Sequence, residues 1–303
     1  MKLQFEVEHI KRDDTEFYAA VGRGHTPSVG FVRIGEEVRN ALNTAVISTV
    51  EHLLEAGETP DQYDPANIHE SSAHLFVPMD SLFTTKAKFL HEVSAPDELN
   101  EPLRQLPRAD LYMAKLVDQS GNKLTAVKKT SDFGRRLKKG FLARLAEGGL
   151  EIDDEPKFQL SEDFDFLIGD EGVFVHRYKQ FETACNLEST LRCAARDNIA
   201  HIRAQVTFLD FDSIEQTAVS SVRSARVIAS IRANNYGARL DIERIRNYCD
   251  QYEIPYSEAE GVMTVEPTHH LDFLRLVGRQ ILGVELVPGE PEVFHAASRR
   301  PYR

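Results

Sequence analysis

The stretch ADLYMAKLVDQSGNKLTAVKKT, residues 109–130, predicts a β-hairpin near the middle of the chain. Its two halves, ADLYMAKLVD and NKLTAVKKT, have the length and pattern of strands. The residues that join them, Gln-Ser-Gly-Asn at 119–122, are typical of a hairpin turn. We therefore expect two antiparallel strands here, with further strands of the sheet before and after them.

The residues before this hairpin predict additional strands and one helix. KLQFEVEHI at 2–10 alternates apolar with polar residues, which indicates a half-buried strand. EFYAAVG at 16–22 and GFVRIG at 30–35 indicate two further strands. Residues 36–56 predict a helix, because their apolar side chains follow helical spacing and Gly57 would end it.

The residues after the hairpin predict a second strand pair and then mostly helices. KFQLSEDFDFLIGDEGVFVHRYKQFE, residues 157–182, is expected to turn at Gly169–Gly172. Helices are expected at residues 178–205, 212–233, 239–251 and 269–282, with a short strand at 262–265 and an extended C-terminal tail. The expected fold class is α+β. Its N-terminal and central strands would form antiparallel sheets, followed by a mostly helical second half and a short C-terminal strand pair.

Two polar, proline-bearing segments, residues 58–70 and 94–107, are expected to be loops. The second of them marks the expected domain boundary. It would separate an N-terminal α+β region, residues 1–105, from a larger α+β domain, residues 106–303.

The composition is that of a globular protein. The 303 residues are 42% hydrophobic and 28% charged. No apolar run approaches the roughly 20 residues that a membrane-spanning helix requires, and the N-terminus lacks the pattern of a secretory signal. Cys185, Cys193 and Cys249 form no C-x-x-C pair, which indicates reduced thiols and a cytoplasmic location.

Positive charge is concentrated in one segment of an otherwise acidic chain. Residues 123–144 contain eight Lys or Arg and a single acid, Asp132, so this segment carries +7. The whole chain carries -12, so the remaining residues carry -19. The cations are Lys123, Lys128, Lys129, Arg135, Arg136, Lys138, Lys139 and Arg144. Segregation of this kind indicates an anionic partner.

Part of this basic segment predicts an amphipathic helix, residues 134–145, with Ser131 or Asp132 as its N-cap. At 100° per residue its apolar side chains fall within about 140° of one another, and most of the cations lie opposite. Like charges at i,i+4, such as Arg135 and Lys139, repel each other. A bound anion accounts for such a cluster better than a solvated surface does, although a plain solvated face stays the alternative.

Arginines on the later predicted helices could extend this basic surface. Arg223 and Arg226 are three residues apart and would share a helix face, and Arg192 and Arg196, four apart, would do the same.

Two aspartates provide the main enzymatic alternative. In DFDFLIGD, Asp163 and Asp165 would lie on one face of a strand, and convergent carboxylates hold Mg²⁺ in phosphodiester hydrolysis. The apolar residues between them favour an ordinary amphipathic strand with a solvated acidic side. No Walker loop, nucleophile elbow or H-E-x-x-H motif is present. Histidines at 69, 74, 269 and 270 lack the spacing of a metal site, so we expect no metal, no cofactor and no catalytic residue.

Three segments carry a resemblance to a known family. They are LTAVKKTSDF at 124–133, FQLSEDFDFLIGDEGVFVHRYKQFE at 158–182 and LDFLRLVGRQILGVELVPGEPEVFHAASRR at 271–300. Over roughly residues 110–300 the chain resembles the KwaB family of the Kiwa antiphage defence system. The resemblance implies a cytoplasmic, dimeric protein that binds phage double-stranded DNA. It also implies recruitment to the inner membrane through the membrane protein KwaA, and it supplies no catalytic residues.

The leading hypothesis is therefore an antiphage defence protein that binds DNA without sequence specificity, through cations that neutralise phosphates. The expected contacts are Lys128, Lys129, Arg135, Arg136, Lys138, Lys139, Arg144, Arg223 and Arg226. One alternative is a metal-dependent nuclease that uses Asp163 and Asp165. The other is a docking module for an acidic protein or an anionic membrane surface. No small-molecule substrate is expected.

Overall fold

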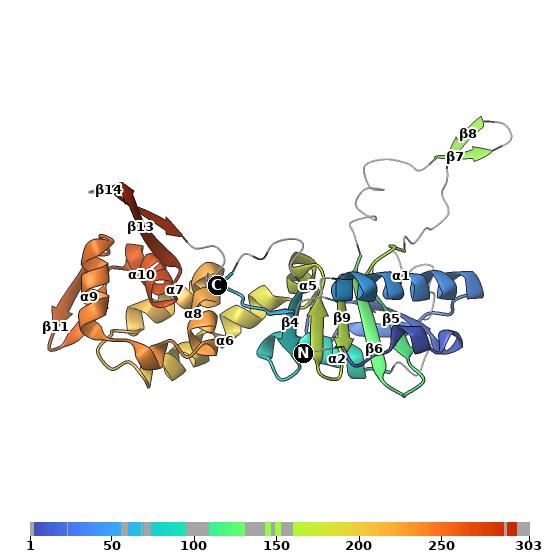
Figure 1. Cartoon of the computed structure of the whole chain (residues 1–303), viewed down its shortest axis with the longest axis horizontal. Helices are drawn as coiled ribbons and strands as arrows, with labels where there is room; N and C mark the ends of the chain where they lie inside the picture. The colour runs from blue at the N-terminus through green and yellow to red at the C-terminus, as the bar shows by residue number, and fades with distance from the viewer. Residues whose placement is uncertain are drawn as a thin grey trace. The chain divides into compact units, whose positions relative to one another are not determined.

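The computed structural model describes residues 3–22, 24–55, 60–67, 69, 74–94, 109–130, 143–146, 149–152, 160–287 and 290–295. Contacts divide the chain into two compact units (Figure 1). Unit 1 comprises Met1–Tyr63 and Ser71–Leu187, and unit 2 comprises Asp64–Glu70 and Glu188–Arg303. The expected division near residue 105 falls inside unit 1, where the strands before and after it are neighbours in one sheet.

Unit 1 is built on a sheet with the strand order β2-β1-β5-β6-β9-β10-β4-β3. The strands are β1 (Glu16–Val21), β2 (Ser28–Phe31), β3 (Asp61–Gln62), β4 (Leu75–Pro78), β5 (Leu111–Val117), β6 (Lys123–Lys129), β9 (Phe166–Gly169) and β10 (Gly172–Val175). Neighbouring strands are antiparallel except β3 and β4, which run parallel. The pairing of β5 with β6 extends from Leu111 opposite Lys129 to Val117 opposite Lys123, which confirms the predicted central hairpin.

Helix α1 (Glu36–Glu55) packs on one face of this sheet (Figure 1). Its Leu42, Val46 and Val50 are buried in one cluster with alternate residues of the strands, among them Ala114 and Leu124. Because side chains alternate along a strand, the residues between these face the other way. Burying each large apolar side chain stabilises the fold by roughly 1.5–3 kcal/mol. The predicted helix at 36–56 is therefore confirmed, and the sheet supplies its partner face.

Helices α2 (Thr85–Glu92) and α5 (Tyr178–Ala184) pack on the opposite face of the sheet. Lys115 of β5, whose neighbours in sequence face α1, donates from Nζ to the carbonyl of His91 at 3.1 Å and also to that of Val93. In α5, the ring centroid of Phe181 lies 5.3 Å from that of Phe166 in β9. The sheet of unit 1 is thus covered on both faces.

The predicted strand at residues 2–10 is wrong. Val7–His9 form a single 3-10 turn, and residues 3–6 have no regular secondary structure. The backbone N–H of Glu6 donates to Oδ2 of Asp118 at 3.2 Å, so this segment binds the turn between β5 and β6. Its apolar alternation arises because Phe5 is buried in the core below α1.

Strands β9 and β10 confirm the second predicted hairpin, with its turn at Gly169–Gly172. Glycine is required at 172, since a Cβ there would lie 2.4 Å from the carbonyl oxygen of Val77 in β4. Strand β9 begins only at Phe166. The expectation that Asp163 and Asp165 share one face of a strand is therefore wrong, because both precede it.

A separate antiparallel pair, β7 (Ala143–Ala146) and β8 (Gly149–Ile152), follows β6 in the chain. The predicted helix at 134–145 is therefore wrong at residues 143–145, because the backbone there pairs with β8 instead of closing helical turns. The rest of that prediction, residues 134–142, lies outside the described residues.

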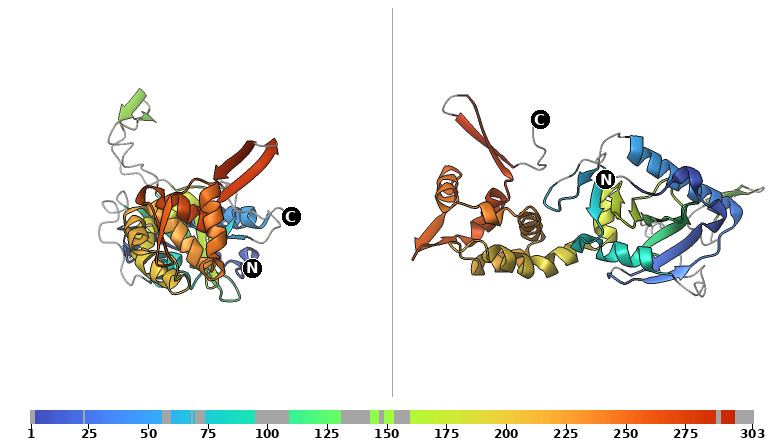
Figure 2. Two further views of the ribbon diagram at one scale, coloured as in Figure 1. Left: turned by 90° about the vertical axis from the view of Figure 1, so that its left-hand side faces the viewer. Right: turned by 60° about the horizontal axis from the view of Figure 1, so that its bottom comes forward.

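Unit 2 is mostly helical and carries two small hairpins (Figure 2). The helices are α6 (Leu187–Arg203), α7 (Asp212–Ser220), α8 (Val222–Ala233), α9 (Ile242–Gln251) and α10 (His270–Val277). The hairpins are β11 (Tyr256–Ala259) with β12 (Val262–Val265), and β13 (Ile281–Val287) with β14 (Glu290–His295). Together with unit 1, this arrangement confirms the α+β class and the C-terminal strand pair.

The long helices expected in this half are interrupted by local backbone features. Asn186, with a φ of 54°, separates α5 from α6. Ser221 begins a new helix, α8, because its Oγ accepts a hydrogen bond from the backbone N–H of Ser224 at 3.3 Å. The helix expected at 269–282 ends at Val277, and Arg279, with a φ of 57°, precedes β13.

An early segment of the chain, Asp64–Glu70, belongs to unit 2 rather than to unit 1. Three hydrogen bonds of 2.9 Å tie it to residues far along the chain. They run from Ser230 Oγ to Asp64 Oδ2, from Arg226 Nη1 to the Pro65 carbonyl and from Gln280 Nε2 to the Ala66 carbonyl. We call this segment the strap of unit 2.

Within the described parts of the chain, no helix has both the length and the apolar character needed to cross a bilayer.

Candidate functional site

Two of the sequence-predicted cations lie next to each other at the end of β6. Lys128 faces α1 and is buried, with 7% of its surface exposed, whereas Lys129 is half-buried. Arg135, Arg136, Lys138 and Lys139 lie outside the described residues, and only the backbone of Arg144 is described, in β7. Apart from the exposed Lys123 at the start of β6, Lys128 and Lys129 are thus the cations of the basic segment whose surroundings can be stated.

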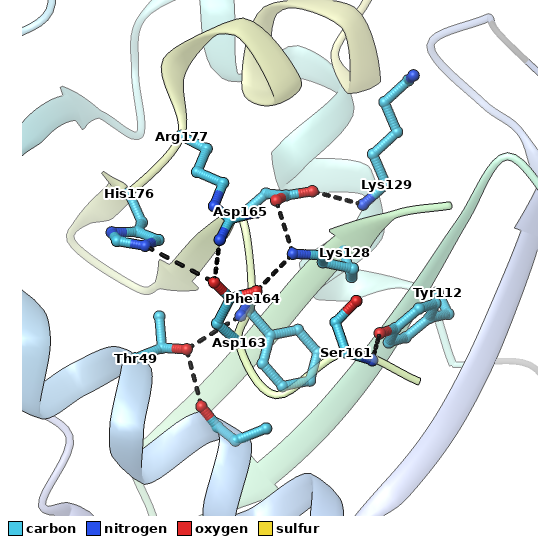
Figure 3. Close-up of polar contacts among 11 residues, drawn as sticks. Thr49, Tyr112, Lys128, Lys129, Ser161, Asp163, Phe164, Asp165, His176 and Arg177 are labelled. Carbon is cyan, nitrogen blue, oxygen red and sulfur yellow. Dashed lines mark hydrogen bonds and ion pairs between the residues drawn. The ribbon is translucent and has the colours of Figure 1, made fainter. Parts of the chain in front are cut away.

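The ammonium group of Lys128 lies between two carboxylates (Figure 3). Its Nζ atom is 2.6 Å from Oδ1 of Asp163 and 3.1 Å from Oδ1 of Asp165. A buried ammonium group is costly unless it is paired and hydrogen-bonded. The two aspartates satisfy this requirement, so the charge of Lys128 is neutralised inside the protein. A DNA phosphate would have to compete with both carboxylates for it.

Asp165 connects β6 to the start of α5. Its Oδ2 accepts a hydrogen bond of 2.8 Å from the backbone N–H of Lys129. Its carbonyl oxygen accepts hydrogen bonds of 3.0 Å and 2.9 Å from the backbone N–H groups of His176 and Arg177. The side chain is 1% exposed, so the expected solvated acidic face is wrong for this residue. Burial raises the pKa of the Asp165 carboxyl, although the charge of Lys128 acts in the opposite direction.

Asp163 is more exposed and has several cationic neighbours. Arg177 forms an ion pair with Oδ2 of Asp163, and Nε2 of His176 lies 4.0 Å from the same oxygen. Burial opposes the ionised form of Asp163, but the hydrogen bond and charge of Lys128, together with Arg177, outweigh burial and lower its pKa. Lys128, Asp163, Asp165 and Arg177 form what we call the charged cluster. Its two positive and two negative groups balance.

Buried hydrogen bonds fix the loop that carries the two aspartates. The backbone N–H of Phe164 donates to Oγ1 of Thr49 in α1 at 3.0 Å, and that hydroxyl donates to the carbonyl of Ala45 at 2.8 Å. The backbone N–H of Ser161 donates to the hydroxyl of Tyr112 at 2.9 Å (Figure 3). Because the Phe164 ring is fully buried, moving this loop and its aspartates away from Lys128 would expose that ring.

This geometry bears on the nuclease alternative. A metal ion held by both Asp163 and Asp165 would have to displace the ammonium group of Lys128, which lies between them. Among the residues that the structure describes, no three His, Cys, Asp or Glu side chains are arranged to hold a metal ion.

Three histidines form a cluster that sequence reasoning missed. The ring centroid of His52 lies 5.0 Å from that of His176 and 5.6 Å from that of His74. Burial, followed by the nearby His52 and Arg177, lowers the pKa of His176 to about 4. The His74 pKa is also lowered, chiefly by burial. The three residues come from distant parts of the chain, so their spacing gave no signal.

The predicted extension on α8 is divided between two environments. Arg223 is exposed, whereas Arg226 is half-buried and donates to the carbonyl of Pro65 in the strap. On α6, an earlier helix, Arg192 pairs with Glu188, and Arg196 pairs with Glu215. On α8, the Arg223 side chain is therefore more accessible to a partner than that of Arg226.

These features define a two-unit α+β protein in which a partly buried charged cluster contains Lys128 of a strongly basic segment. A family model described as "Kiwa protein KwaB-like" matches residues 109–283. The chain belongs to this KwaB-like family, which associates it with Kiwa antiphage defence and confirms the resemblance seen in the sequence. Comparison with curated proteins and with solved structures gives no match.

Proposed function

We propose that this protein acts in Kiwa defence by binding double-stranded phage DNA without sequence specificity. The contact surface would be formed by the basic segment from the end of β6 onward, beginning at Lys128 and Lys129. The observation that carries the proposal is the concentration of charge, +7 over residues 123–144 against -19 elsewhere. Cations without matching acids attract phosphates, and each phosphate contact releases counterions. The acidic remainder would repel DNA from other surfaces and so orient the encounter.

The contrast between Lys128 and Lys129 supports this assignment at the level of single residues. Lys128 is neutralised by Asp163 and Asp165. In the described part of the chain, no carboxylate lies within ion-pair distance of the Lys129 ammonium group, although Asp165 holds its backbone. Lys129 is therefore anchored through its main chain and keeps its charge for a partner.

A salt titration of DNA binding tests the proposal. The wild-type protein is expected to bind two unrelated duplexes equally well. If Arg135, Arg136, Lys138 and Lys139 each contact one phosphate, log K should fall with log[salt] with a slope contribution of about -3.6. Replacing these four residues by Glu should abolish binding.

The matched control makes the same charge change on exposed residues elsewhere, namely Lys11, Arg12, Lys88 and Arg244 to Glu. It should retain most of the affinity. Equal loss in both variants would show only a net-charge effect and would overturn the assignment of the surface. Retention of vesicles containing anionic lipid, without retention of DNA, would favour the docking alternative.

The oligomeric state and the membrane partner that the family implies belong to the same proposal. We infer that the protein works as a homodimer and is recruited to the inner membrane by the membrane protein KwaA. Light scattering of the purified protein should give twice the mass of one chain. Co-expressed KwaA should retain it on a membrane fraction, and a monomer that stays in the supernatant would contradict both statements.

We also propose that Asp163 and Asp165 perform no nuclease chemistry, because Lys128 occupies the space between them. Incubation of phage DNA with the protein and Mg²⁺ or Mn²⁺ should leave the DNA intact. Cleavage that disappears in the variant Asp163→Ala/Asp165→Ala would overturn this statement.

A further inference from the structure

We propose that Arg177 is an additional phosphate contact of the DNA-binding surface and that Asp163 holds it until a phosphate replaces that carboxylate. The inference rests on the proposed function and adds a residue outside the basic segment. It also implies that the ion pairs of the charged cluster modulate the affinity for DNA.

Asp163 pairs with two cations, whereas Arg177 pairs with one carboxylate in the described part of the chain. This difference allows a phosphate to replace Asp163 as the partner of Arg177. Asp163 is the carboxylate that pairs with Arg177 in the described part of the chain. Asp163 itself has a second cation, because Nζ of Lys128 lies 2.6 Å from its Oδ1. When Arg177 leaves, Asp163 therefore keeps a hydrogen-bonded positive partner. A partly buried carboxylate without any cation would be costly, and the exchange avoids this because Lys128 stays paired with Asp163.

Exposure distinguishes Arg177 from Lys128. The side chain of Arg177 is 47% exposed, whereas that of Lys128 is 8% exposed. Removing Lys128 from the cluster would leave Asp165, at 1% exposure, without its cation. Ion pairs at exposed sites contribute little to stability and exchange readily. Of the two cations in the cluster, Arg177 is therefore the one that a phosphate can reach and recruit.

The backbone places Arg177 near Lys129, where the basic segment leaves β6. The N–H of Arg177 donates to the carbonyl of Asp165, while the N–H of Lys129 donates to the carboxylate of the same residue. Figure 3 shows Lys129 and Arg177 flanking Asp165. A DNA backbone that contacts Lys129 would thus approach Arg177 as well. The guanidinium group can bind a phosphate with two parallel hydrogen bonds, a geometry that Lys does not provide.

Equilibrium DNA binding over a salt series tests this inference with matched variants. Arg177→Ala should weaken binding and reduce the magnitude of the salt slope by about 0.9, the value for one lost phosphate contact. Asp163→Asn should strengthen binding by roughly 3- to 10-fold at low salt, since Arg177 then has no carboxylate to leave. The double variant Asp163→Asn/Arg177→Ala should bind as weakly as Arg177→Ala, because the gain operates through Arg177.

The Arg203–Asp212 pair in unit 2 supplies the control. Its arginine is equally exposed, at 47%, and lies 2.6 Å from Asp212. Arg203→Ala and Asp212→Asn therefore make the same charge changes without touching the charged cluster. Circular dichroism would verify folding. If Asp163→Asn does not fold, Arg177→Ala and the charge-retaining Arg177→Lys carry the test, with Arg177→Lys expected to keep the slope but bind more weakly than wild type.

The outcomes separate the two proposals. Wild-type protein that fails to bind DNA would overturn the proposed function. Wild-type protein that binds, with Arg177→Ala indistinguishable from Arg203→Ala in affinity and slope, would overturn only the role of Arg177.

Discussion

Oγ1 of Thr49 accepts a hydrogen bond of 3.0 Å from the backbone N–H of Phe164, which lies 115 residues further along the chain. The same hydroxyl donates to the carbonyl of Ala45, one turn earlier in α1. One side chain therefore joins the helix to the loop that carries Asp163 and Asp165. Through this contact the position of the charged cluster depends on a helix that contributes none of its charges.

Thr49→Val should test this connection, because it keeps the shape of the side chain and removes the hydroxyl. The Phe164 N–H would then be buried without a partner, which costs about 1–3 kcal/mol in the free energy of unfolding. Urea denaturation measures the change. Thr44→Val is the matched control, since Thr44 donates to the carbonyl of Asn40 in the same helix but at an exposed site. It should change stability by less than about 0.5 kcal/mol, and equal effects would contradict the role given to Thr49.

Lys128→Met should be much more damaging than its position in a basic segment suggests. It would leave the fully buried Asp165 without its cation, and Asp163 with Arg177 alone, which costs about 3–5 kcal/mol. Lys123→Met, at the exposed opposite end of the same strand, should be nearly neutral. Adding Asp165→Asn to Lys128→Met should restore part of the loss, because it removes one uncompensated charge. A loss below about 0.5 kcal/mol for Lys128→Met would show that the ion pairs do not support the fold.

Acid should destabilise the protein through His176. Its pKa is about 4 in the folded protein and near 6.5 when unfolded, so between these values only the unfolded chain binds the proton. The free energy of unfolding should therefore fall as the pH is lowered from about 6.5 to about 4. His176→Asn should flatten this fall in denaturation curves measured across that range.

His9 provides the opposite case for comparison. Its ring is exposed, and the hydrogen bond with Glu6 raises its pKa. Any stability that it contributes is present at acid pH and is lost as the pH rises through the folded pKa. His9→Asn should therefore leave the acid-induced loss in place. A flattened curve in His9→Asn and an unchanged one in His176→Asn would contradict the assignment.

Gly172→Ala should strain the junction of β10 and β4, because the new methyl group would lie 2.4 Å from the backbone oxygen of Val77. A clash with backbone is relieved only by moving a strand, and overpacking of this kind costs typically 1–3 kcal/mol. Gly35→Ala places a methyl group in open space and should leave the melting temperature nearly unchanged. Similar melting temperatures for the two variants would argue against a tight β10–β4 contact.

Prediction from the sequence succeeded where one local pattern decides the structure. The hairpins at 109–130 and at Gly169–Gly172 combine strand patterns with turn residues, and both are present. It failed where distant partners decide. The alternation at residues 2–10 reflects burial of Phe5 and a bond from Glu6 to Asp118, neither of which a local pattern can show.

The candidate site was predicted only in part for the same reason. From the sequence, Lys128 was predicted as a DNA contact, and Asp163 and Asp165 as a possible metal site. Nothing in the sequence indicated that these residues contact one another. The pair of Lys128 and Asp163 joins residues 35 positions apart, one at the end of β6 and the other in the loop before β9. The role of Thr49 had no signal at all, since a threonine within a helix is common and its partner is far away in sequence. Breaks such as Asn186 depend on single backbone angles, which periodicity does not encode.

The strap of unit 2 is synthesised long before the residues that it contacts. Asp64 and Ala66 leave the ribosome 166 and 214 residues before their respective partners Ser230 and Gln280. At 5–20 residues per second, this delay is roughly 10–40 s. Throughout that time the nascent chain holds a piece of unit 2 flanked by residues of unit 1. A fragment that starts at residue 188 would lack the strap altogether, so unit 2 should be produced alone only with Asp64–Glu70 supplied as a peptide or by circular permutation.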